Sequence, residues 1–142
     1  MNMVTMLVVP EGARQQPSVL LVEDDSLVAA SLKRLLTALD FEVLETRSAA
    51  DAMAALQSGE TPACVWSDLD LGEEIDGVDV LIAAARLRPM PALLLVTACP
   101  GCARAAECPA EALVFAKERA RDAALAAAAA VLLRRKAGRP AD

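Results

Sequence analysis

Short, mainly apolar segments recur five times along the chain, and each ends on or beside a polar residue. They occupy residues 18–22, 41–47, 63–68, 92–97 and 112–116. Apolar runs of this length are typical of strands that are buried on both faces. Because segments with helical patterns separate them, the sequence predicts βαβ crossovers and a parallel sheet covered by helices on both sides.

Periodicity and capping residues predict the helices between these segments. After the first strand, apolar residues recur at i, i+4, i+7, i+8 and i+11, and either Asp25 or Ser26 can cap this helix. Ser48 is expected to cap a second helix, and Pro89 is expected to stop a third helix over residues 78–88.

The remaining connections complete one domain. Two prolines and a glycine interrupt the segment between the fourth and fifth strands, so only a short helix over 103–108 is expected there. An alanine-rich helix over 118–136 follows the fifth strand. The 142-residue length fits a single domain, which we expect over 18–136, with tails at 1–17 and 137–142.

Composition excludes several classes of function. Aromatic residues make up 2% of the chain and the net charge is −6, which argues against a nucleic-acid site built on stacking and basic groups. The longest apolar run, residues 123–133, is too short for a membrane span of about 18 residues or more. The first residues lack the pattern of a targeting segment, so we expect a cytoplasmic protein without a membrane partner.

Histidine is absent and cysteine occurs four times, at Cys64, Cys99, Cys102 and Cys108. The absence of histidine rules out histidine-based catalysis, histidine-ligated zinc and a role as a histidine phosphodonor. In a cytoplasmic protein we expect no structural disulfides. The last three cysteines have the spacing C-x₂-C-x₅-C, which leaves a redox pair or a metal clip as alternatives to simple packing in a loop.

Polar side chains follow four of the predicted strands. Glu23 and Asp24 come after the first strand, Asp68 ends the third, Thr97 ends the fourth and Lys117 comes after the fifth. Since the carboxyl ends of parallel strands meet at one edge of a sheet, we expect these side chains to lie together. Crowded carboxylates favour a hard cation such as Mg²⁺, and a hydroxyl and an ammonium can hold phosphoryl oxygens. The set therefore indicates phosphoryl transfer to a carboxylate.

The segments VLLVEDD, VWSDLDLG with a following DG, LLLVTA and a lysine after the fifth strand resemble the receiver domains of two-component response regulators. The resemblance extends from about residue 18 to residue 136. It implies an α/β, flavodoxin-like (βα)₅ fold, doubly wound, with a five-stranded parallel sheet in the order 2-1-3-4-5.

The resemblance also implies roles for individual residues. Asp68 matches the phosphoacceptor, Thr97 the switch hydroxyl and Lys117 the lysine that pairs with the phosphoryl group. Asp76 and Gly77 match the pair that opens the third helix. The residues that would bind Mg²⁺ are Glu23, Asp24 and Asp68, together with the backbone carbonyl of Asp70.

The partners that the resemblance implies are a sensor histidine kinase or a histidine phosphotransfer protein, a downstream protein target and, as one option, a second copy of the chain. The domain would be a phospho-accepting signalling module rather than an enzyme, with self-catalysed phosphoryl transfer and autodephosphorylation only.

Two departures from the family pattern leave alternatives open. Glu118 stands where the family has a proline after a cis peptide bond, and Val114 stands where it has an aromatic residue. One alternative is therefore a degenerate receiver that acts as a phosphorylation-independent interaction module. Another is a thiol switch that uses Cys99 and Cys102.

Overall fold

The structure of the protein is a computed structural model that describes residues 16–137. Within this range five parallel strands form one sheet in the order β2-β1-β3-β4-β5, which confirms the predicted fold class. The expected tails at 1–17 and 137–142 lie almost wholly outside the described residues. The strands are β1 (Ser18–Val22), β2 (Glu42–Thr46), β3 (Cys64–Ser67), β4 (Ala92–Thr97) and β5 (Leu113–Ala116).

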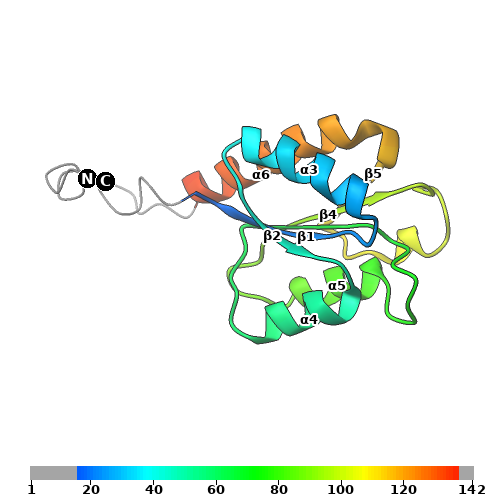
Figure 1. Cartoon of the computed structure of the whole chain (residues 1–142). Coiled ribbons are helices and arrows are strands. Elements are labelled where there is room, and N and C mark those ends of the chain that lie inside the picture. Colours follow the sequence, from blue (N-terminus) through cyan, green and yellow to red (C-terminus); the bar gives the residue numbers. More distant parts are fainter. Residues whose placement is uncertain (1–15, 138–142) are drawn as a thin grey trace, which may run out of the picture.

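Helices cover both faces of this sheet (Figure 1). Helices α3 (Ser26–Ala38) and α6 (Ala120–Ala137) lie on one face, and α4 (Ala49–Gln57) and α5 (Gly77–Ala84) lie on the other. Successive side chains of a strand point to opposite faces. Leu21, for example, packs in the core cluster beneath α3 and α6, whereas Leu20 packs in the cluster beneath α4 and α5. None of the helices within residues 16–137 is long and apolar enough to cross a membrane.

The caps explain where the first two helices begin. The Asp25 carboxylate accepts hydrogen bonds from the backbone N–H groups of Leu27 and Val28, at 2.9 and 3.1 Å. Asp25, and not Ser26, is therefore the cap of α3. Ser48 caps α4 as predicted, because its hydroxyl accepts a hydrogen bond from the N–H of Asp51.

Two helices differ from the prediction. Helix α5 ends at Ala84 rather than near residue 88. The residue before a proline avoids the helical conformation. Before Pro89, the backbone N–H groups of Arg86 and Leu87 already donate to the carbonyls three residues earlier, not four as in an α-helix. The expected helix over 103–108 is a single 3₁₀ turn, η1 (Ala105–Glu107). A second 3₁₀ turn, η2 (Lys117–Arg119), precedes α6.

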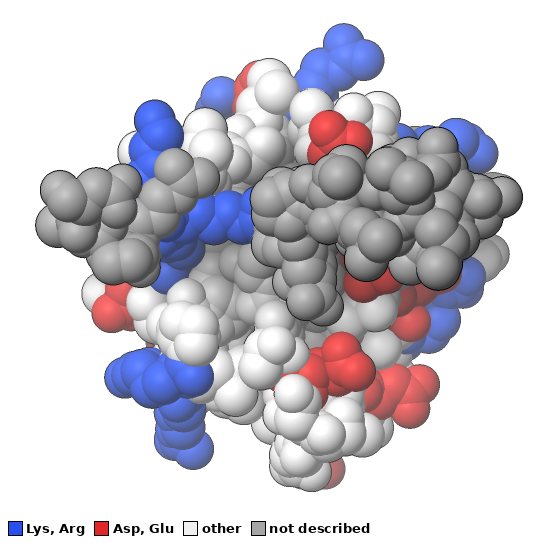
Figure 2. All heavy atoms as spheres, turned by 90° about the vertical axis from the view of Figure 1, so that its left-hand side faces the viewer, with Lys and Arg blue, Asp and Glu red and all other residues white. Residues whose placement is uncertain are grey.

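The two ends of the sheet differ in the side chains that they carry. Figure 2 shows the end at which the strands begin, where basic and acidic side chains are both exposed. The polar residues singled out from the sequence lie at the opposite end, where the strands finish.

Candidate functional site

The register of the strands brings the predicted site residues to one edge of the sheet. Val22 of β1 lies opposite Ser67 of β3, so Glu23 and Asp68 leave the sheet beside each other. Thr97 of β4 lies opposite Ala116 of β5, which places Lys117, the first residue after β5, at the same edge. These side chains, with that of Asp24, line a pocket of about 530 Å³, which we call the acidic pocket.

Asp68 is held in a fixed position in the acidic pocket. The residue is 6% exposed, and its Oδ1 accepts a hydrogen bond of 2.7 Å from the N–H of Leu69. Its backbone carbonyl accepts a hydrogen bond of 2.7 Å from the buried hydroxyl of Ser67. Backbone and carboxylate are therefore both oriented by neighbours in the sequence, and Oδ2 faces the pocket towards Lys117.

Three carboxylates gather at this point. Glu23, Asp24 and Asp68 each offer an oxygen, and these oxygens lie within 4.8 Å of one another. Glu23 is 3% exposed. Burial raises the pKa of Glu23 above its usual value, and the charge of Asp68 adds to this shift against the opposing ammonium of Lys117. The pocket is therefore short of positive charge.

Lys117 is the cation of the acidic pocket. Its Nζ lies 3.0 Å from Asp68 Oδ2 and 3.9 Å from Glu23 Oε1. Burial works against its charge, but the hydrogen bond and the charge of Asp68 hold the pKa of Lys117 above its usual value. The one cis peptide bond among the described residues joins Arg88 and Pro89. The bond between Lys117 and Glu118 is therefore trans, and Lys117 forms its ion pair with Asp68 across a trans peptide bond.

The donor set of the acidic pocket fits a magnesium ion. It consists of oxygen atoms, which Mg²⁺ prefers, and it carries more negative charge than Lys117 alone can balance. Asp70 lines the same pocket, and its exposed carboxylate accepts a hydrogen bond of 3.1 Å from the N–H of Gly72. This hydrogen bond lies within the loop that follows β3.

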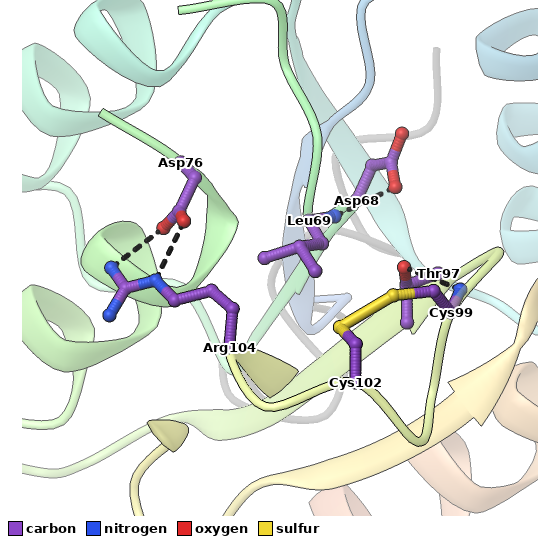
Figure 3. Close-up of a disulfide and its surroundings, with 7 residues drawn as sticks. All are labelled: Asp68, Leu69, Asp76, Thr97, Cys99, Cys102 and Arg104. Carbon is purple, nitrogen blue, oxygen red and sulfur yellow. Dashed lines mark hydrogen bonds and ion pairs between the residues drawn. A yellow bond between two sulfur atoms is a disulfide. The ribbon is translucent and has the colours of Figure 1, made fainter. Parts of the chain in front are cut away.

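Thr97 ends β4 and is 3% exposed. Its Oγ1 accepts a hydrogen bond of 3.1 Å from the N–H of Cys99. Cys99 in turn forms a disulfide with Cys102, as Figure 3 shows beside Asp68. The expectation that the chain has no structural disulfide is therefore wrong for this pair, because the turn after β4 brings the two sulfur atoms together. Cys64 and Cys108 are free.

Arg104 is not among the residues that the sequence predicts for the site. Its guanidinium holds both carboxylate oxygens of Asp76 at 2.8 and 3.0 Å, and also contacts Asp79 at 2.8 Å and Glu107 at 2.6 Å. Burial acts to raise the pKa of Asp76, but the hydrogen bonds and the charge of Arg104 outweigh it and lower that pKa. Asp76 and Arg104 are 28 residues apart, and no local pattern in the sequence links them.

Asp76 caps α5 in a capping box with Asp79, which agrees with the predicted start of this helix. Gly77 follows it, and a Cβ built there would lie 1.9 Å from the carbonyl oxygen of Asp68. Arg104 therefore joins the segment after β4 to the helix start that lies directly against Asp68.

Val114, the residue at the position where an aromatic side chain was expected, lies in the edge strand β5. Val114 is 37% exposed, whereas the neighbouring Phe115 packs against the core cluster beneath α3 and α6. The Phe115 ring also lies under the guanidinium of Arg119, 5.8 Å from its central carbon. The aromatic side chain is thus on the opposite face of β5 from Val114, as the alternation of side chains in a strand requires.

Comparisons with known proteins agree with this arrangement. The family model described as "Response regulator receiver domain" matches residues 19–124. A CheY-like receiver domain protein from Methanospirillum hungatei JF-1 is 23% identical with a TM-score of 0.76, and the match covers 87% of this chain and 100% of that one. A response regulator receiver protein from Sinorhizobium medicae WSM419 is 21% identical with a TM-score of 0.77, with coverage of 85% and 98%. No curated protein matches the chain significantly.

Because the family model matches most of the chain, the protein belongs to the response regulator receiver domain family. Members of this family are in general signalling modules rather than enzymes, and they generally partner with histidine kinases. The triad of Glu23, Asp24 and Asp68 is typical of the magnesium site in receivers.

Proposed function

We propose that this chain accepts a phosphoryl group on Asp68 in a Mg²⁺-dependent reaction, from a phosphohistidine of a sensor histidine kinase or a histidine phosphotransfer protein. The observation that carries this proposal is the buried Asp68 carboxylate, 3.0 Å from Lys117 and clustered with the carboxylates of Glu23 and Asp24. A structural ion pair needs one carboxylate for one ammonium. Three carboxylates around one lysine instead favour a site for a further cation and for chemistry.

The transfer joins an oxygen of Asp68 to phosphorus while the bond from phosphorus to the donor imidazole nitrogen breaks. The electron pair of that bond stays on the imidazole nitrogen, and the product on this chain is an acyl phosphate. The ammonium of Lys117 and the hydroxyl of Thr97 would donate hydrogen bonds to the phosphoryl oxygens. Hydrolysis by water would then restore the carboxylate and release inorganic phosphate.

The residues that would hold Mg²⁺ are Glu23, Asp24 and Asp68, with the backbone carbonyl of Asp70. When bound, the ion would neutralise the carboxylates and the phosphoryl charge that a nucleophilic attack brings together. The raised pKa of Glu23 supports this assignment, because a buried carboxylate with too little compensating charge gains most from a divalent cation. We infer that the reaction takes place in the cytoplasm and that the signal passes on through protein contacts.

The experiment is incubation with a small-molecule phosphodonor and Mg²⁺, read by intact mass. We expect one phosphoryl adduct on the wild type and none on Asp68→Asn, with Asp51→Asn as a control because Asp51 is exposed at the start of α4. Lys117→Met should slow adduct formation roughly 100-fold, as the loss of one charge-stabilising donor does elsewhere. An adduct that persists in Asp68→Asn would show that the acceptor is another residue.

One observation favours a second candidate function, a phosphorylation-independent interaction module. Between β4 and β5, a segment that is described throughout, the only helix is the three-residue η1, and Val114 cannot act as an aromatic reporter of the Thr97 position. This candidate predicts that a partner captured by the chain binds wild type and Asp68→Asn equally, with and without phosphodonor. Binding that changes on phosphorylation of the wild type contradicts it.

A further inference from the structure

We propose that Cys99 and Cys102 form a reversible redox site, which small disulfides oxidise and dithiols reduce, and that its oxidation slows phosphorylation of Asp68 by restraining Thr97. The effect on phosphorylation rests on the proposed function of Asp68. The redox exchange itself is argued from the segment after β4 alone.

The two cysteines are placed for exchange with molecules in solution. They are bonded in the structure, three residues apart, with their Cα atoms separated by 5.6 Å. Cys99 is exposed and Cys102 is half-buried, which is the residue exposure that exchange with a small thiol or disulfide requires. The other two cysteines are free, and Cys64 is fully buried beneath α3 and α6.

The disulfide is connected to the acidic pocket by the backbone. Cys99 lines the pocket together with Asp68 and Lys117, and its N–H donates the hydrogen bond of 3.1 Å to Thr97 Oγ1. Figure 3 shows the disulfide, the Thr97 hydroxyl and the Asp68 carboxylate in this arrangement. The bond therefore fixes the residue that orients the Thr97 hydroxyl, and a hydroxyl that is held in place cannot follow an incoming phosphoryl group.

The Cys102 end of the disulfide is anchored. Its side chain packs against the core cluster beneath α4 and α5, and its N–H donates to the carbonyl of Cys99 at 3.2 Å. Two residues further on, Arg104 binds Asp76 at the start of α5. In the oxidised form the disulfide therefore ties Cys99 to this anchored residue. Reduction removes that covalent tie and leaves Cys99 held by its hydrogen bonds with Thr97 and Cys102.

Oxidation balances as a thiol–disulfide exchange with a low-molecular-weight disulfide. One thiolate attacks a sulfur of that disulfide, forms a mixed disulfide and expels one thiolate of the reagent. The second cysteine thiolate then attacks the mixed disulfide, closes the Cys99–Cys102 bond and expels the second thiolate. The protein loses two electrons and two protons, and a dithiol reductant reverses both steps.

Reduction should change this segment and leave the global fold intact, because a cross-link that closes a very short loop removes little entropy from the unfolded chain. The expected effect on phosphorylation is an increase in rate of about fivefold on reduction, the factor that corresponds to releasing roughly one net hydrogen bond. Hydrogen exchange of residues 97–104 should rise in parallel.

The experiment equilibrates the full chain in mixtures of oxidised and reduced glutathione and then quenches it by differential alkylation with peptide mass analysis. Phosphodonor and Mg²⁺ are added to an unquenched portion of each sample, and the rate of phosphoryl adduct formation is measured by intact mass. We expect one Cys99–Cys102 bond that forms and breaks across the series. The variant with both Cys99→Ser and Cys102→Ser should be phosphorylated at the rate of the reduced wild type at every ratio of oxidised to reduced glutathione. Cys108→Ser should respond to that ratio as the wild type does.

The outcomes separate the two halves of the inference. Oxidation that pairs Cys108, or that leaves both Cys99 and Cys102 free, overturns the redox site. A Cys99–Cys102 bond that forms without changing either the adduct rate or the hydrogen exchange of residues 97–104 overturns the coupling to Thr97. A chain that takes no phosphoryl group in any state contradicts the proposed function of Asp68, while the alkylation and exchange measurements still decide the redox site.

Discussion

Gly77, at the start of helix α5, lies directly against Ser67 and Asp68 at the end of strand β3, and its replacement by alanine tests the packing of the site. A Cβ there would lie 1.9 Å from the carbonyl oxygen of Asp68 and 2.8 Å from Ser67 Oγ. Ordinary contacts of this kind are about 3.5 Å. The start of α5 and the Asp68 carbonyl must therefore separate by more than about 1 Å, given the contact distance that carbon requires.

Two interactions are disturbed by this separation. They are the hydrogen bond from the Gly77 N–H to the Leu69 carbonyl, at 2.9 Å, and the bond from the Ser67 hydroxyl to the Asp68 carbonyl, at 2.7 Å. Overpacking of a rigid site costs about 1–3 kcal/mol, while alanine at a helical position returns about 0.5–1 kcal/mol relative to glycine. Because a contact of 1.9 Å is severe, the upper end of the overpacking range applies, and we expect Gly77→Ala to lower the free energy of unfolding by about 2 kcal/mol net.

Urea denaturation followed by circular dichroism measures this loss. The matched control is Gly101→Ala, because a Cβ at Gly101 meets nothing within 4 Å, and we expect its stability to stay within about 0.5 kcal/mol of the wild type. The Gly77 variant should also bind Mg²⁺ more weakly, since the Asp68 backbone moves. A Gly77→Ala protein as stable as the wild type, or more stable, would refute this account of the contact.

Three further predictions follow from other contacts. Asp25→Ala should lower the free energy of unfolding by about 1 kcal/mol through loss of the α3 cap, and an equal loss in Ser26→Ala would contradict the assignment of Asp25 as the cap. Against the effect of burial, Arg104 lowers the pKa of Asp76. The ionised carboxylate therefore stabilises the fold above the unfolded-state pKa of about 3.9, and this stabilisation is lost as the pH falls through the lower folded pKa. The difference in free energy of unfolding between wild type and Arg104→Met should then shrink as the pH falls in acid. A difference that stays constant over that range would contradict this effect of Arg104 on Asp76. Burial raises the pKa of the Cys64 thiol to about 12, so iodoacetamide should label it in urea and not in the native protein; native labelling would show that this thiol is accessible.

Local patterns accounted for most of the elements. The fourth strand was predicted with the bounds that it has, Ala92–Thr97, because a run of apolar residues that ends on threonine leaves little choice of limits. The Ser48 cap was also found, since a cap and the backbone groups that it binds lie within one turn of each other. The end of α5 was placed too late, because a proline affects the conformation of residues before it in a way that apolar periodicity does not record.

The acidic pocket was found from the sequence for a related reason. Glu23, Asp68 and Lys117 each follow a strand directly, and in a parallel sheet the carboxyl ends of the strands share one edge. The order of the strands was a different matter. It came from the resemblance to a family, since alternating strands and helices do not by themselves fix which strands are neighbours.

The sequence by itself thus determined the elements, the class of sheet and the residues of the acidic pocket, because these depend on neighbours a few positions apart and on which residues end a strand. Only the tertiary structure decided the Arg104 clamp on Asp76, the contact of Gly77 with Asp68 and the bond between Cys99 and Cys102. The first joins residues that are 28 positions apart in the chain. The second depends on how closely the start of α5 packs against the end of β3, and the third depends on how the segment after β4 turns. All three depend on packing in three dimensions, which periodicity along the chain does not encode.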